Sequence, residues 1–249
     1  MTDPTSPPTR DPTHDPTHDP THHRPTTTVQ IGTLRLTGGA ALLALLAIVG
    51  LMVALIVRTR PAFGASCLWV SAALWIAFLV YWSRAARTAS AARSTEPAAS
   101  RALHQNLLNL SLLLLFLRLP GLRTRWLPDT AAWAAVGLAL QAGMFALAAW
   151  ARRHLGRHWS GIIAAKVDHE LVRTGPYRVL RHPIYTAMLG MTAGTALVAG
   201  RTHALAGLAI MIVAYARKIP IEEASLRATF GDAYDDYRRR SWALVPGIF

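Results

Sequence analysis

Apolar and polar positions fall into long alternating blocks along the chain. Six apolar blocks are separated by short polar segments, and three of them exceed the roughly 20 residues that a transmembrane helix needs, while the other three are shorter. We therefore expect an all-α, polytopic membrane helix bundle of five to six transmembrane helices, five if residues 102–119 do not cross fully. A polar helical segment over 221–240 is expected to follow as a cytoplasmic helix. The predicted spans are 36–57, 62–82, 102–119, 130–150, 183–200 and 203–216.

Composition supports a membrane protein and argues against several other classes. Of 249 residues, 52% are hydrophobic and only 16% are charged, whereas soluble domains carry about a quarter charged residues. The net charge of +13 is spread over many short loops without interleaved aromatic residues, which argues against nucleic-acid binding. A single cysteine, Cys67, excludes a disulfide within the chain and a cysteine-based metal site, and no metal is predicted.

The chain divides into three regions by composition. Residues 1–30 repeat Asp-Pro-Thr-His and hold almost nothing apolar, so we expect a disordered tail whose histidines are solvated rather than bound to metal. Residues 31–150 hold the N-terminal predicted helices. Residues 151–249 hold two further apolar blocks and the densest polar segments of the chain.

The distribution of basic residues predicts an orientation. If both termini are cytoplasmic and all six blocks cross, six of the 26 Lys and Arg residues lie outside and the other 20 lie inside. This asymmetry obeys the positive-inside rule, most simply in a plasma (inner) membrane. The two polar segments of the C-terminal region, residues 168–185 and the pair Glu222 and Glu223, then face the cytoplasm.

Residues 168–185 are the most informative polar stretch. Gly175 and Pro176 predict a turn, with Tyr177 directly after it. Pro183 suits the first turn of a helix, which leaves His182 near the N-cap, where anionic groups are favoured. These residues could instead anchor the helices at the depth of the lipid headgroups. An anchor does not need Gly-Pro and His-Pro together, so we favour a ligand-binding site, called the collar, formed by the motifs within residues 174–185.

Two adjacent carboxylates, Glu222 and Glu223, follow the last apolar block. They either stabilise the first turn of a following helix or face a positively charged ligand. Spacing alone leaves both interpretations open.

The ordered motifs of residues 150–249 resemble the isoprenylcysteine carboxyl methyltransferase family, which belongs with the membrane phospholipid methyltransferases. The resemblance rests on Gly-Pro-Tyr, Arg-His-Pro-Ile-Tyr, Glu-Glu, Phe-Gly-Asp-Ala-Tyr and a late Val-Pro, in this order. It implies an integral membrane enzyme that takes S-adenosylmethionine as methyl donor at the cytoplasmic face. The residues implied for cofactor binding are His169, Leu171, Val172, Gly175, Pro176, Tyr177, Arg181, His182, Pro183, Tyr185, Glu222 and Glu223.

The same resemblance implies a small or lipid-like acceptor, a carboxylate first, with Glu222, Glu223 and Arg240 as catalytic residues. The family often has Arg where this chain has Lys218, so Lys218 is a weaker candidate for holding a carboxylate. Phospholipid amines and thiols stay open as acceptors, as does the oligomeric state. A sterol-reductase-like enzyme and a non-catalytic membrane scaffold are the competing interpretations.

Overall fold

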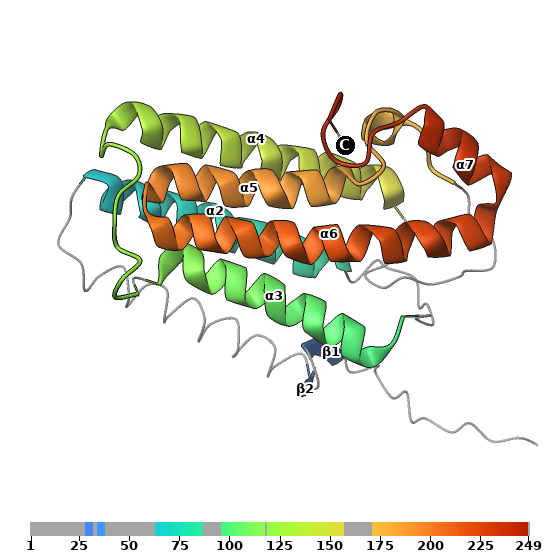
Figure 1. The fold of residues 1–249 in the computed structure, drawn as a ribbon, viewed down its shortest axis with the longest axis horizontal. Helices are drawn as coiled ribbons and strands as arrows, with labels where there is room; N and C mark the ends of the chain where they lie inside the picture. The colour runs from blue at the N-terminus through green and yellow to red at the C-terminus, as the bar shows by residue number, and fades with distance from the viewer. Residues whose placement is uncertain are drawn as a thin grey trace, which may run out of the picture.

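The computed structural model describes residues 28–31, 34–37, 63–86, 96–117, 119–156 and 171–248 (Figure 1). Most of the predicted tail and of the first predicted span lies outside these residues. The exception is an antiparallel hairpin of β1 (Thr28–Ile31) and β2 (Leu34–Thr37), with Thr28 opposite Thr37. The sequence analysis did not anticipate this hairpin, although both runs are rich in residues that favour strands.

The other regular elements of the described chain are helices, which confirms the expected helical architecture; the number of membrane spans stays a prediction. The described residues form six α-helices and one 3₁₀ turn, η2, which lies between α4 and α5 in the chain. Their bounds are α2 Phe63–Ala86, α3 Ala98–Phe116, α4 Ala131–Leu155, η2 Gly175–Arg178, α5 Pro183–Ala199, α6 Thr202–Phe230 and α7 Asp232–Arg239.

Three of the described helices are long and apolar enough to cross a membrane: Ser66–Ala85 within α2, all of α4, and α6. The apolar helix α5 is shorter, at 17 residues. The described helices are thus those of an integral membrane protein.

Helix α6 differs most from its prediction, because it continues 14 residues beyond the expected end at residue 216, to Phe230. Pro220 lies inside it, where a proline removes one backbone hydrogen bond without ending the helix in this case. The break comes at Gly231, whose φ of +52° suits glycine. The predicted polar helix over 221–240 is therefore the end of α6 followed by α7.

Helices α4 and α5 approach each other through glycine. A Cβ on Gly194 would lie 2.5 Å from the carbonyl oxygen of Gly137, so neither position has room for a side chain. Close backbone approach through small residues is a common way to pack helices in membranes. On the other side of the bundle α3 packs on α6, where the Ser111 hydroxyl donates to the Gly207 carbonyl at 2.7 Å.

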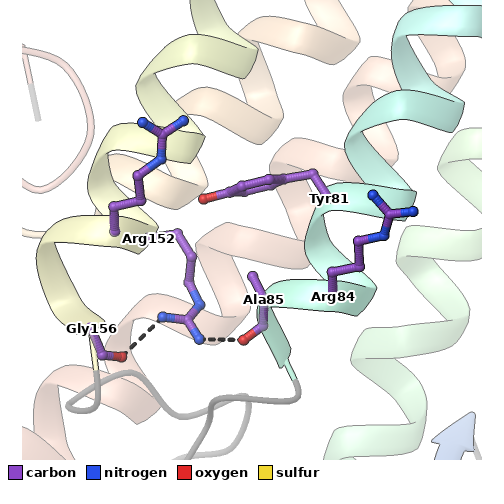
Figure 2. Close-up of a pocket in the computed structure, with 6 residues that line it drawn as sticks. Tyr81, Arg84, Ala85, Arg152 and Gly156 are labelled. Atoms are coloured by element: carbon purple, nitrogen blue, oxygen red, sulfur yellow. Dashed lines mark hydrogen bonds between the residues drawn. The ribbon is translucent and has the colours of Figure 1, made fainter.

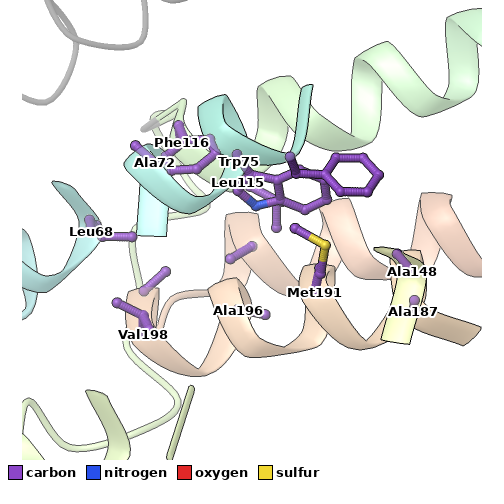
Figure 3. Close-up of a cluster of buried hydrophobic side chains, with 13 residues drawn as sticks. Leu68, Ala72, Trp75, Leu115, Phe116, Ala148, Ala187, Met191, Ala196 and Val198 are labelled. Atoms are coloured by element: carbon purple, nitrogen blue, oxygen red, sulfur yellow. The ribbon is translucent and has the colours of Figure 1, made fainter. Parts of the chain in front are cut away.

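An apolar cluster with a polar centre holds α2 against α4 and α5. Trp75 is buried among Leu115, Phe116 and Met191 (Figure 3), and its indole N–H donates to Thr195 Oγ1 at 2.9 Å. Gln141 also accepts a hydrogen bond from the Ser71 hydroxyl at 2.7 Å. These partners satisfy polar groups that would otherwise be costly in an apolar interior.

Figure 1 shows α4, α5, α6 and α3 lying lengthwise beside one another, with α7 beyond one end of the bundle. A left-handed residue, Gly200 (φ +59°), ends α5, and α6 begins two residues later. The tight antiparallel hairpin of α5 and α6 sets the start of α5 beside the later turns of α6. This juxtaposition positions the candidate site.

Candidate active site at the mouth of the α5–α6 hairpin

The predicted collar and the glutamate pair meet in the structure. His182 is the N-cap residue of α5 and Pro183 occupies its first turn. Arg181 Nε donates to Glu223 Oε1 at 2.8 Å, and His182 Nε2 lies 3.3 Å from the same oxygen. Since these three side chains are at most 14% exposed, the ion pairs are largely desolvated.

The second glutamate has its own partner. The Tyr185 hydroxyl donates to Glu222 Oε2, and His182 Nδ1 lies 3.9 Å from that oxygen. The Tyr185 ring stacks on the His182 ring with centroids 5.3 Å apart, and on the Tyr215 ring at 4.5 Å. The glutamates therefore face the collar and do not merely cap a helix.

The C-terminal segment fixes the collar from outside. The backbone N–H groups of Arg181 and His182 donate to the carbonyls of Trp242 and Ala243 at 2.7 and 3.1 Å. The Thr186 hydroxyl donates to the Leu244 carbonyl at 2.8 Å.

The predicted Gly-Pro-Tyr turn is present as η2 and packs on the end of α4. Gly175 has a φ of +59°, and a Cβ there would lie 2.7 Å from the His154 ring, so the position requires glycine. The His154 ring stacks on Tyr177, and the Tyr237 hydroxyl donates to the Tyr177 carbonyl at 2.6 Å.

Two buried phenols near the glutamates have no hydrogen-bond partner among the described residues, namely Tyr177 and Tyr234. Burial raises the pKa of both phenols well above the ordinary value, and the charge of Glu222 adds to the effect on Tyr177. Both therefore stay protonated donors. Buried donors without partners are rare in native proteins and suit a site that receives a ligand.

Several predicted residues lie elsewhere or outside the described chain. His169 is outside the described residues, while Leu171 and Val172 are half-buried just before η2. Arg240 does not join the cluster: it is exposed and pairs with Asp236 at 3.0 Å. Arg238 is the member of the triplet Arg238-Arg239-Arg240 that approaches Glu223, with Nε 3.6 Å from Oε2.

A buried ion pair that was not predicted from the sequence lies beside the site. Lys218 Nζ donates to Glu96, which precedes α3, and neither side chain is more than 9% exposed. The Ser100 hydroxyl also donates to Glu96, at 2.6 Å. Glu96 lies in a loop otherwise marked by arginines, and its isolation there was the only available signal.

The segment that carries this site is similar to known proteins. Residues 132–233 match the family described as phospholipid methyltransferase. A protein-S-isoprenylcysteine O-methyltransferase of Schizosaccharomyces pombe is 33% identical over 96 residues, which cover 37% of this chain and 41% of that protein. Methanethiol S-methyltransferase 2 of Bradyrhizobium diazoefficiens is 41% identical over 75 residues, 29% of this chain and 27% of that protein.

A solved structure of a eukaryotic intramembrane Ras methyltransferase, isoprenylcysteine carboxyl methyltransferase, overlays with a TM-score of 0.37 and 19% identity. That overlay covers 80% of this chain and 61% of the other. Each of the two alignments covers less than half the length of the curated relative. The family match over residues 132–233 includes η2, α5 and α6, which carry the collar and the glutamate pair. Residues 132–233 are thus similar to the phospholipid methyltransferase family, the resemblance that the motifs of the polar stretch predict.

Proposed function

We propose that this protein is an integral membrane methyltransferase that uses S-adenosylmethionine and methylates a small or lipid-like acceptor, a carboxylate first. The single observation that carries the proposal is the meeting of Arg181, His182 and Tyr185 with Glu222 and Glu223 at the mouth of one helix hairpin. The family of residues 132–233 and the printed activities of the relatives support it.

The polar groups around the collar fit the parts of S-adenosylmethionine. The unpartnered phenols of Tyr177 and Tyr234 offer two buried donors. The first turn of α5 and Arg181 suit the donor's carboxylate, whereas the glutamate pair suits its ammonium and sulfonium charges. His169, Leu171, Val172, Gly175, Pro176 and Pro183 complete the proposed wall.

When bound, S-adenosylmethionine supplies an electrophilic methyl group on a sulfonium. The side chains of this protein then have to align the acceptor with that methyl and exclude water. An acceptor carboxylate is already ionised and attacks without losing a proton. A thiol or an amine must lose one, and Glu222, Glu223 or His182 lies in the cluster to take it.

The charge that would hold an acceptor carboxylate comes from α7. Lys218 is buried in its pair with Glu96, whereas Arg238 and Arg240 pair with Glu223 and Asp236 at the surface and are 49% and 77% exposed. We assign acceptor binding to Arg240, as the family resemblance implies, together with Arg238. A cytoplasmic orientation of both termini, in a plasma or inner membrane, would place α7 and the collar where a soluble cofactor is available.

Calorimetric titration of S-adenosylmethionine into the detergent-purified protein tests the proposal. We expect saturable binding that is lost in His182→Ala. Tyr177→Phe should weaken binding by about fivefold to tenfold, the value of one hydrogen bond. Its thermal unfolding temperature should not fall, because the removed hydroxyl has no partner in the described structure.

A reduced nicotinamide dinucleotide serves as the matched ligand control. Binding of the nicotinamide in place of S-adenosylmethionine would favour the sterol-reductase-like interpretation. If the folded protein binds neither, the enzymatic proposal is wrong and the scaffold interpretation stands.

A further inference from the structure

A second pocket, with a volume of about 320 Å³, opens between the C-terminal ends of α2 and α4 (Figure 2). None of the residues proposed above for the methyl donor or the acceptor lines it. Its lining consists of Tyr81, Arg84, Ala85, Arg152, Arg153 and Gly156.

Three of the described lining residues are arginines, and none of the described lining residues is acidic. Arginines near helix C-termini are often explained by the partial negative charge of the last carbonyls. That explanation accounts for Arg152, which is buried and donates to the Ala85 carbonyl and, at 2.9 Å, to the Gly156 carbonyl. Arg84 and Arg153 also lie in the last turns of their helices, but their side chains are exposed and have no carboxylate partner within the described residues, so they remain available to a ligand.

The walls of the pocket are held in place across the two helices. Arg152 of α4 reaches the last turn of α2, as the dashed lines in Figure 2 show. In return, the Tyr81 hydroxyl of α2 donates to the Ala149 carbonyl of α4 at 3.2 Å. A preformed site loses little conformational entropy when it takes up a ligand.

The position of the pocket along the helices indicates the source of its ligand. The apolar stretch Ser66–Ala85 and helix α4, both long enough to cross a membrane, end at this pocket. Trp150, 53% exposed on α4, lies just before it, as expected for an interfacial aromatic residue. The pocket is therefore at the depth of the lipid headgroups.

We infer that this pocket binds a phosphate group, supplied by the headgroup of an anionic membrane lipid. Arginine forks from two helices suit phosphate oxygens, and basic pockets between transmembrane helices bind anionic headgroups. The volume lies within the range of small-ligand sites. The inference does not depend on the proposed methyl transfer.

Titration of a fluorescent phosphatidylglycerol into the detergent-solubilised full-length protein tests the inference. Wild type is compared with Arg84→Gln, Arg153→Gln and the double variant. We expect affinity to fall about fivefold for each arginine removed. Fluorescent phosphatidylcholine, which has no net charge, should bind weakly to all variants.

Arg239→Gln is the matched control, because it removes an exposed arginine of α7 outside the pocket. It should bind phosphatidylglycerol like the wild type. Competition by inorganic phosphate separates the two sources: displacement of the lipid by millimolar phosphate would identify a soluble phosphate as ligand, and resistance would identify the lipid. Equal phosphatidylglycerol affinity of wild type and folded double variant would overturn the inference.

Discussion

At the residue scale, the ion pair of Glu96 and Lys218 couples two distant parts of the chain. Glu96 precedes α3, while Lys218 lies on α6, one helical turn before Glu222. Burial alone would raise the pKa of Glu96, but hydrogen bonds from Lys218 and Ser100 hold the pKa below its ordinary value of 4.5. The ionised carboxylate is thus the form that the fold stabilises.

This pair predicts acid sensitivity of a definite sign. Because the folded pKa is below the unfolded one, the stabilisation is complete above pH 4.5 and is lost as the pH falls below it. Glu96→Gln should cost about 3–5 kcal/mol at neutral pH, since it leaves Lys218 buried without its partner. Thermal unfolding in detergent between pH 7 and pH 4 should show the difference from wild type shrinking toward acid pH.

The double variant Glu96→Gln/Lys218→Met is the control for this measurement. It removes the stranded charge, so it should recover most of the lost stability. A single variant as stable as wild type at pH 7 would show that the pair contributes nothing.

At the element scale, the close contact of α4 and α5 determines where the collar lies relative to η2. Helix α4 carries His154, which packs on Gly175, and α5 begins at the collar itself. The two helices meet through Gly137 and Gly194. A change in their separation therefore moves one wall of the proposed cofactor site against the other.

We predict that Gly194→Ala destabilises the protein by about 1–3 kcal/mol, because its Cβ would clash with the backbone of α4. Gly143→Ala, on the same helix as Gly137, meets nothing within 4 Å. It should be neutral or stabilising by about 0.5–1 kcal/mol. Unfolding temperatures in detergent check both changes, and equal values for the two variants would contradict the packing argument.

The sequence predicted the helices well where hydrophobic length decides the structure. The helix predicted over 183–200 was found as Pro183–Ala199, because His-Pro starts it and Gly200 ends it. The apolar block predicted to end at residue 216 did not mark the end of a helix, because α6 continues through Pro220 to Phe230. The pairing of the collar with Glu223 was anticipated from the family motifs, whereas Glu96 was not, because no local pattern records a contact over 122 positions.

At the scale of the whole molecule, both ends of the bundle carry arginines, and the end with the α2–α4 pocket and α7 carries more. Arg84, Arg152 and Arg153 lie at the pocket, and residues 238–240 lie at the end of α7. Arg125 and Arg201 pair by backbone at the turn between α5 and α6. By the positive-inside rule, we propose that the end with α7 is the cytoplasmic one.

This orientation predicts the outcome of labelling in intact cells. In a Cys67→Ala background, Arg123→Cys should react with a membrane-impermeant maleimide, since it lies in the loop before α4. Arg239→Cys should react only after the cells are opened. Labelling of Arg239→Cys in intact cells would reverse the orientation and place the collar outside.

The backbone bonds between the collar and residues 242–244 have a consequence for biosynthesis. Domains generally form in the order in which their segments leave the ribosome. Helix α5 emerges well before the segment that fastens its first turn, with all of α6 and α7 between them. A nascent chain can therefore insert its helices into the bilayer while the collar is still open. The proposed site is completed only when residues 242–244 return to it, so we expect membrane integration to precede its completion.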